Sequence, residues 1–350
     1  MSVQSNRLPG IEFFRFYFIL WICLCHIWKA FNAPHVNFGV EYFFIVAGFF
    51  LYQSFSKKRL SFIDYAVSRW KRLFPVYFVG LVLAYVINVA IAHSDGSLNI
   101  LNSFYDFIVQ ASFLFETGFF HSPSLQANAL IPLWFVGVLF VASLFLYLCL
   151  CCSEYLSTRV IFPLFIFCFF AFTFTKGLHL TDFWGVETVD EMPFLLPALG
   201  RGLAEMCIGI EIAALFEEGC FQSIQSHRLL NILSVLAVIL LSVYAFFIED
   251  YHEPLMLVMM VILVTALAIP SSWLNRLFSG KIWLHLGSIT YEILCLHMVS
   301  RYIINGLYPY FPVCRILWIV AYILLTILIA ELVHLGLKQI TFKTNLKYHG

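Results

Sequence analysis

The stretch GIEFFRFYFILWICLCHIWKAF, residues 10–31, decides the class of fold. It is long enough to cross a bilayer as one helix, since about 20 apolar residues suffice. It is too long for the apolar region of a signal peptide and lacks a small-x-small cleavage site, so we expect it to remain in the mature protein. Two of its residues, Arg15 and His26, are ionisable and lie inside the apolar run.

The rest of the 350-residue chain has the same apolar character. It is 62% hydrophobic and 11% charged, whereas about a quarter of the residues of soluble domains are charged. This composition predicts an integral membrane protein with one membrane domain over residues 1–350 and no sizeable soluble domain. Basic and acidic residues are equal in number, 20 each, which excludes a broadly basic surface for nucleic acid.

Breaks at Pro, Gly and charge clusters predict an all-α fold of about ten transmembrane helices. The predicted spans are residues 10–31, 38–55, 73–92, 130–151, 160–175, 195–216, 229–248, 254–270, 282–300 and 314–337. Most Lys and Arg residues then lie on the side of both termini, which the positive-inside rule assigns to the cytoplasm. Residues 104–120 are apolar but interrupted by Asp106, Gln110 and Glu116, which favours an interfacial or re-entrant piece over a span.

The ten cysteines lie mostly within apolar runs and are interpreted as small buried residues. Neither Cys23 and Cys25 nor the group at 149–152 has the spacing and the accompanying histidines of a zinc site. We therefore expect no metal and no permanently bound cofactor.

Ionisable side chains within the spans mark candidate sites, because a charge at the bilayer centre costs about 3 kcal/mol. Arg15 and His26 are eleven residues apart, so on one helix they share a face and are separated by about 16 Å along its axis. The alternative is that each extends to the nearer headgroup layer. Glu12 lies close to Arg15, and Glu41 begins the second span.

Two further groups of charges are candidates. The run SRWKRLFP at residues 68–75 places Arg69, Lys71 and Arg72 before the third span, where they can bind phosphates or anionic lipid. Arg201 and Glu205 are four residues apart and can form an intramembrane pair, which would also serve a purely structural role.

Six blocks of the sequence resemble, in order, motifs of the acyltransferase-3 family of membrane acyltransferases. The first is Gly10-Ile11-Glu12-x-x-Arg15 followed by His26, which resembles the family's Arg-x10-His signature. The others are residues 39–49, Arg69-x-x-Arg72-Leu73-Phe74-Pro75, Leu133-Trp134-Phe135, Arg201-x-x-x-Glu205-x-x-x-Gly209, and residues 286–297, which include Tyr291 and His297.

The chain departs from the family pattern at several points. Ala47 replaces the usual Ser before Gly48, and Val138 and Leu139 stand where many members carry a carboxylate. We also expect no appended esterase-like domain, so the transfer would be completed within the membrane domain or with a partner.

The resemblance implies an enzyme that moves an acyl group, most often acetyl, from cytoplasmic acyl-CoA to a hydroxyl of a surface or lipid-linked glycan. It implies location in the bacterial cytoplasmic (inner) membrane. His26 would act as general base or form a histidyl acyl-enzyme, and the sequence leaves both open. Arg15 would act on the pantetheine arm or thioester carbonyl of the donor, or would hold Glu12 or Glu41. Arg69, Arg72 and Lys71 would bind the phosphates of the donor.

Glu12, Glu41, Trp134, Arg201, Glu205, Tyr291 and His297 complete the set of candidates. For Tyr291 and His297 the alternative is interhelical hydrogen bonding. A transporter or flippase of a glycan or lipid precursor, and a non-catalytic subunit of glycan assembly, stay open as other classes. The expected partners are acyl-CoA, the glycan acceptor and the bilayer, with no nucleic acid; homo-oligomer formation is left open.

Overall fold

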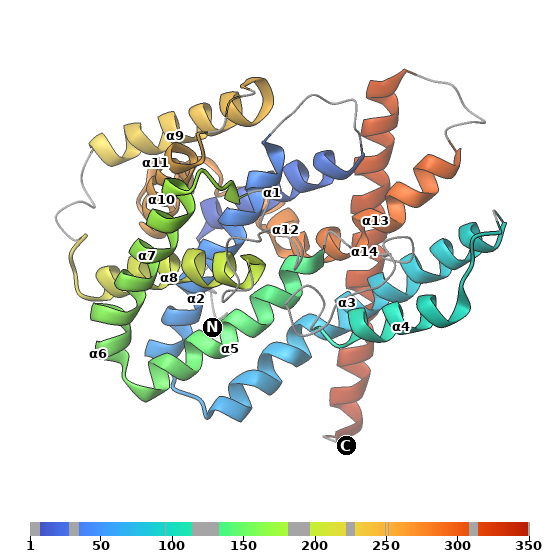
Figure 1. Cartoon of the computed structure of the whole chain (residues 1–350), viewed down its shortest axis with the longest axis horizontal. Coiled ribbons are helices and arrows are strands. Elements are labelled where there is room, and N and C mark those ends of the chain that lie inside the picture. Colours follow the sequence, from blue (N-terminus) through green and yellow to red (C-terminus); the bar gives the residue numbers. More distant parts are fainter. Residues whose placement is uncertain are drawn as a thin grey trace.

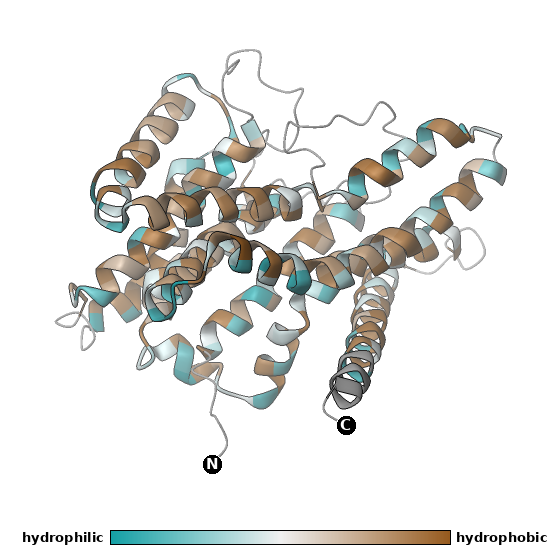
Figure 2. Ribbon diagram, turned by 90° about the horizontal axis from the view of Figure 1, so that it is seen from below, coloured by the Kyte–Doolittle hydropathy of each residue, from teal (hydrophilic) through white to brown (hydrophobic). Residues whose placement is uncertain are grey.

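The computed structural model is all-helical in the part of the chain that it describes, and these residues form no strand. The described residues are 8–27, 35–94, 96–113, 133–180, 197–221, 228–248, 250, 252–307 and 314–348. The predicted all-α class is therefore confirmed for them. Apolar residues dominate almost every helix (Figure 2), as expected for a bundle surrounded by lipid.

Seven helical segments are long and apolar enough to span a membrane. They are Pro9–His26, Val36–Lys57, Phe62–Ser94, Trp134–Cys152, Glu154–Thr175, Arg228–Phe247 and Arg315–Gln339. They correspond to α1 (Pro9–Ile27), η1 (Val36–Phe38) with α2 (Gly39–Lys57), α3 (Phe62–Ser94), α5 (Trp134–Cys152), α6 (Glu154–Leu156) with η3 (Ser157–Ile161) and α7 (Phe162–Thr175), α9 (Arg228–Phe247), and most of α14 (Arg315–Tyr348). An eighth span is a broken one, because α12 (Lys281–Ser288) and α13 (Thr290–Leu307) meet at 62°.

Two further helices coincide with predicted spans, but one is too charged and the other is too short to be counted as a membrane span. α8 (Pro197–Glu217) contains Arg201, Glu205 and Glu211, and α10 (Glu253–Ala268) has only 16 residues. The described residues thus give seven spans, or eight with the broken pair. The count of about ten and the cytoplasmic location of both termini stay predictions.

The segment after α3 does not span in its described part. α4 (Ile100–Ala111) has 12 residues, with Asp106 and Gln110 buried and Phe104 exposed. It runs back along α3 (Figure 1), and the Tyr77 hydroxyl of α3 donates to the Gln110 carbonyl at 2.8 Å. This agrees with the interfacial or re-entrant prediction for residues 104–113, and residues 114–120 lie outside the described part.

α2 and α8 cross at a contact that admits only glycine. A Cβ on Gly48 would lie 2.0 Å from the Met206 carbonyl oxygen, and one on Gly209 would lie 1.9 Å from that of Ile45. Small residues at crossings are typical of membrane helices, because they let backbones approach closely. This crossing brings α8 against the buried residues of α2.

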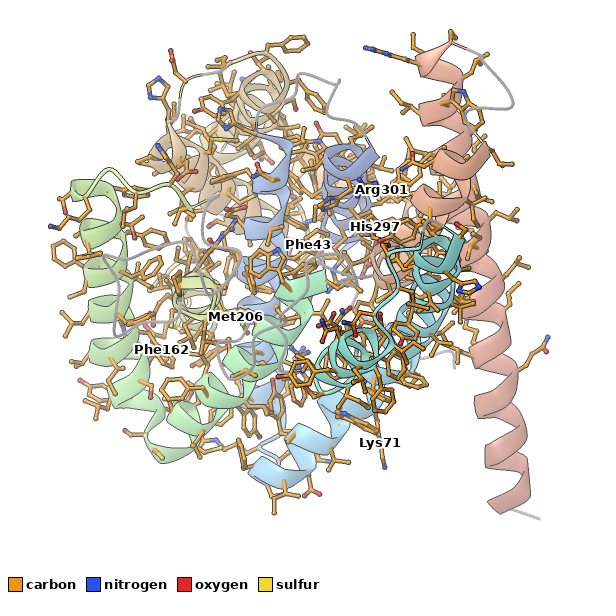
Figure 3. All side chains as sticks on the ribbon, turned by 45° about the vertical axis from the view of Figure 1, so that its right-hand side comes forward. Phe43, Lys71, Phe162, Met206, His297 and Arg301 are labelled. Atoms are coloured by element: carbon orange, nitrogen blue, oxygen red, sulfur yellow. The ribbon has the colours of Figure 1, made fainter. Side chains whose placement is uncertain are left out.

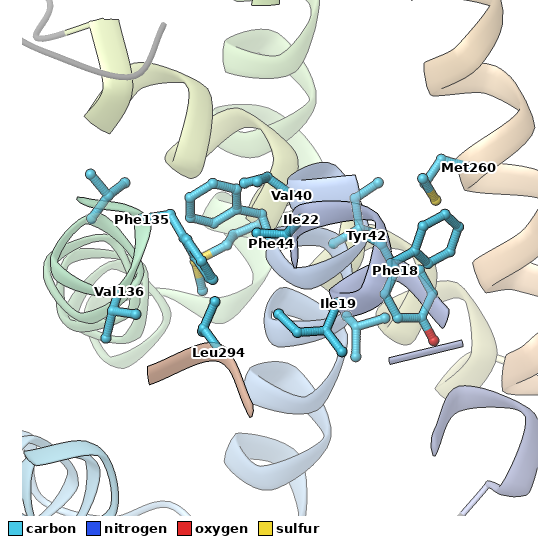
Figure 4. Close-up of a cluster of buried hydrophobic side chains, with 14 of the residues drawn as sticks. Phe18, Ile19, Ile22, Val40, Tyr42, Phe44, Phe135, Val136, Met260 and Leu294 are labelled. Carbon is cyan, nitrogen blue, oxygen red and sulfur yellow. The ribbon is translucent and has the colours of Figure 1, made fainter. Parts of the chain in front are cut away.

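α1 lies at the centre of the candidate site because it contacts both α12 and α13. A Cβ on Gly287 of α12 would lie 2.5 Å from the backbone oxygen of Glu12, so these two helices also pack at glycine distance. Phe18 and Ile19 of α1 lie in a buried cluster with Tyr42 of α2 and Leu294 of α13 (Figure 4). α14 stands beside α13 as the long helix at the right of Figure 1.

All ten cysteines are free. Cys23, Cys207 and Cys295 are buried as predicted, but six others are exposed, among them Cys25 and Cys168 on the outside of helices and Cys220 and Cys314 beyond helix ends. The prediction that they are all buried was wrong, because an apolar run fits an outward-facing helix surface as well as the core.

Candidate active site

The N-terminal half of α1 faces a group of charged side chains. The Arg15 guanidinium lies 3.5 Å from a Glu12 carboxylate oxygen and 5.4 Å from the centre of the Phe50 ring. Arg72 of α3 is within electrostatic reach of Arg69, Arg15, Glu12 and Tyr291. The structure thus brings Arg15, Arg69 and Arg72 together, and we call these three residues the arginine cluster.

The two arginines of α3 in this cluster have no carboxylate partner among the described residues. Arg69 lies 5.9 Å over the Tyr65 ring, and its Nε and Nη2 are buried without a hydrogen-bond partner. Arg72 is exposed. Lys71, the third predicted cation, is also exposed and projects outward at the lower edge of Figure 3, so it does not join the cluster.

Tyr291 links α13 to the same region. Its hydroxyl donates to the Leu73 carbonyl at 2.9 Å, directly after Arg72 in the chain. This is the interhelical hydrogen bond that the sequence offered as the alternative to a catalytic role. It fixes α13 against the end of α3 that carries the arginine cluster.

At the other end of α1, its His26 lies beside a histidine of α13, and we call these two residues the histidine pair. The rings of His26 on α1 and His297 on α13 have centroids 5.4 Å apart, at 35° to each other. His297 is completely buried, and its Nδ1 lies 2.5 Å from the Leu294 carbonyl oxygen. A carbonyl only accepts, so Nδ1 carries the proton and Nε2 has a free lone pair. This Nε2 is buried with no hydrogen-bond partner.

The arginine cluster and the histidine pair are joined by one continuous helix. α1 runs without a break from Pro9 to Ile27, so Arg15 and His26 lie on one face about 16 Å apart, rotated by only about 20°. α13 contacts both ends of the site. Its Tyr291 binds α3 at the arginine cluster, and its His297 lies beside His26 of α1.

Sequence reasoning missed Arg301. The predicted span 282–300 ends just before this residue, but the structure places it on α13, one turn after His297 (Figure 3). Its charge acts on both His26 and His297. The signal was present in the sequence, because residues four apart on a helix share a face.

Glu41, Arg201 and Glu205 form a separate buried network between α2 and α8. The Arg201 Nη2 donates to Glu41, and its Nε donates to Glu205 at 3.1 Å. Trp134 of α5 lies under the guanidinium, 5.6 Å from the Arg201 Cζ. All three charged residues are at most 2% exposed, so this network ties three helices together in the core.

The described residues contain no group of three or more His, Cys, Asp or Glu side chains that would hold a metal ion. The candidate chemistry therefore rests on the arginine cluster, the histidine pair and Arg301.

These observations define a helical membrane protein with cations at one end of a buried helix and paired imidazoles at the other. The sequence model of the acyltransferase-3 family, described as an acyltransferase domain, matches residues 8–334, nearly the whole chain. The chain belongs to this family of membrane acyltransferases, which confirms the resemblance carried by the six blocks. No curated protein and no solved structure matches the chain.

Proposed function

We propose that the protein transfers an acyl group, most often acetyl, from cytoplasmic acyl-CoA to a hydroxyl of a surface or lipid-linked glycan, in the inner membrane of a bacterium. The observation that carries this proposal is the arrangement along α1, where Arg15 of the arginine cluster and His26 of the histidine pair share one face about 16 Å apart along the helix axis. It suits a donor whose charged phosphates are separated from its reactive thioester by a long, narrow arm.

The arginine cluster is suited to the phosphates. Guanidinium groups bind phosphate oxygens through two parallel hydrogen bonds, and no carboxylate in the described part of the chain is ion-paired with Arg69 or Arg72. Arg15, beside Glu12 on the path to the histidines, would contact the donor further along its arm. The thioester would then lie beside His26.

The histidine pair is suited to the transfer step. A neutral imidazole of His26 takes the proton from the acceptor hydroxyl, and the hydroxyl oxygen attacks the thioester carbonyl carbon. The carbon–sulfur bond breaks, and the CoA thiolate takes the proton from the imidazolium and leaves as the thiol. A two-step route through an acylated His26 gives the same products. His297 would hold a fixed tautomer beside this group.

The test uses purified protein in nanodiscs with labelled acetyl-CoA and a glycan extract from a strain that lacks the gene. We expect the parent to label the glycan and His26→Ala to lose the activity while it inserts in parent amounts. His93→Ala is the matched control, because His93 is an exposed histidine at the end of α3. Parent-level transfer by His26→Ala would reject this site. Mass spectrometry of the labelled glycan identifies the acceptor.

A further inference from the structure

One turn of α13 beside His26 carries three polar side chains with buried, unpartnered atoms. These atoms are the His297 Nε2, the Ser300 Oγ and the Arg301 Nε. Ser300 and Arg301 follow His297 by three and four positions, so both lie on the same face of the helix as His297. His297 and Ser300 are completely buried. Buried polar atoms are nearly always hydrogen-bonded, so three of them on one face point to a polar ligand.

Arg301 supplies a positive charge to this face. It lies one turn after His297 on the same face of α13 (Figure 3), within electrostatic range of His26, His297 and Cys25. The Arg301 Nη1 donates a weak hydrogen bond to the Met298 sulfur, 3.9 Å away. A guanidinium is charged at every physiological pH, and its five N–H groups only donate.

Arg301 differs from Arg15 and Arg201, which are ion-paired, and resembles Arg69 of the arginine cluster in having no carboxylate partner among the described residues. Arg15 pairs with Glu12, and Arg201 pairs with Glu41 and Glu205. No carboxylate of the described residues pairs with Arg301. Arg301 is half-buried with its Nε enclosed, so its charge is suited to an anion that arrives with the substrate.

We propose that Arg301 binds an anionic group of the acceptor, a carboxylate or a phosphate close to the hydroxyl that is acylated. The enzyme would therefore act on acidic or phosphate-bearing glycans in preference to neutral ones. This inference rests on the proposed function and adds the class of acceptor. Ser300 and the His297 Nε2 would hydrogen-bond the neighbouring polar groups of the same sugar.

Two matched pairs of acceptors test the proposal and separate the two sources of the anion. Methyl glucuronide is compared with methyl glucoside for the carboxylate, and a prenyl-phosphate glucose with the neutral prenyl glucoside for the phosphate. Binding to the protein in nanodiscs is measured by saturation-transfer NMR, and acetyl transfer is measured separately. We expect the parent to bind the anionic member of one pair about 10- to 100-fold more tightly.

The variants assign the preference to Arg301. Arg301→Gln should remove it by weakening the anionic acceptor alone, and Arg301→Lys should retain part of it, because a Lys keeps the charge but not the two-pronged geometry. Lys176→Gln is the matched control, because Lys176 is an exposed cation at the end of α7. It should keep the full preference.

Three results would overturn the inference. The parent could bind both members of both pairs equally; this comparison needs no variant to fold. Arg301→Gln could lower kcat equally for neutral and anionic acceptors, which would make Arg301 a stabiliser of the transition state. Its effect could instead depend only on the anionic lipid content of the nanodisc, which would make it a headgroup anchor. Anion-selective binding without acetyl transfer would reject the proposed function instead and leave this site standing.

Discussion

Neighbouring cations on α3 give a sharp test of the donor site. Both Arg72 and Lys71 are exposed, but Arg72 belongs to the arginine cluster, whereas Lys71, one position earlier, projects away from it. Gln at either position removes one positive charge from the same turn of the same helix. A general attraction of the loop for anions would therefore respond equally to both changes, and a specific phosphate site would not.

The expected magnitude follows from the contacts. Arg72 has no carboxylate partner among the described residues, so its loss removes a charge-assisted interaction with the donor worth about 1.5–3 kcal/mol. This corresponds to a rise of about 10- to 100-fold in KM for acyl-CoA. We expect kcat to change little, because Arg72 lies at the Arg15 end of the site, and His26 is about 16 Å from Arg15 along α1. Lys71→Gln should change KM less than about fivefold, because Lys71 points away from the cluster and an exposed charge without a direct contact contributes about 1 kcal/mol or less.

The assay is acetyl transfer at varied acetyl-CoA in nanodiscs of neutral lipid, with direct binding of a non-hydrolysable acyl-CoA analogue as a second readout. Equal effects of Arg72→Gln and Lys71→Gln would show that the loop acts only through its overall charge. If the variant with Gln at both Arg69 and Arg72 binds the analogue as tightly as the parent, the cluster is a lipid anchor and the donor site is elsewhere.

Three other predictions concern the scaffold. Arg201→Ala leaves buried carboxylates unpaired and should destabilise the protein by about 3–5 kcal/mol, measured as unfolding in detergent. Gly209→Ala forces α8 away from α2 and should lower the melting temperature, whereas Gly336→Ala on α14, where a Cβ meets nothing within 4 Å, should not. For the topology, an impermeant maleimide added to intact cells should label Ser97→Cys above the parent background and leave Ser279→Cys unlabelled; the reverse pattern would invert the predicted orientation.

The fold was predictable where hydropathy and charge agree. The helix at residues 10–31 was found because an apolar run of spanning length is distinctive, and α1 covers most of it. The status of α8 and α10 was not predictable in this way. α8 tolerates Arg201 and Glu205 because they pair with each other and the arginine also donates to Glu41 on α2, and hydropathy along the sequence carries no information on a partner from another helix.

Part of the candidate site was also visible in the sequence. Helical spacing places Arg15 and His26 on one face, but it contains nothing about the approach of α13, which creates the His26–His297 pair across 271 positions of the chain. Nor does spacing separate Lys71 from its neighbours, because the direction of each side chain depends on how α3 packs on α1. Local periodicity predicts faces, and only the tertiary contacts determine which faces meet.

The break between α12 and α13 explains how one helix reaches both ends of the site. At the break the chain turns by 62°, so α12 packs across the start of α1 through Gly287, while α13 continues beside α1 as far as the histidine pair. α14 contacts both halves, because Glu331 pairs with His285 on α12, and His334 lies 2.6 Å from Glu292 on α13. A straight helix could not make all of these contacts at once. The distance from the arginine cluster to the histidine pair is therefore set by two rigid helices, and the bend that aligns them is held by a third.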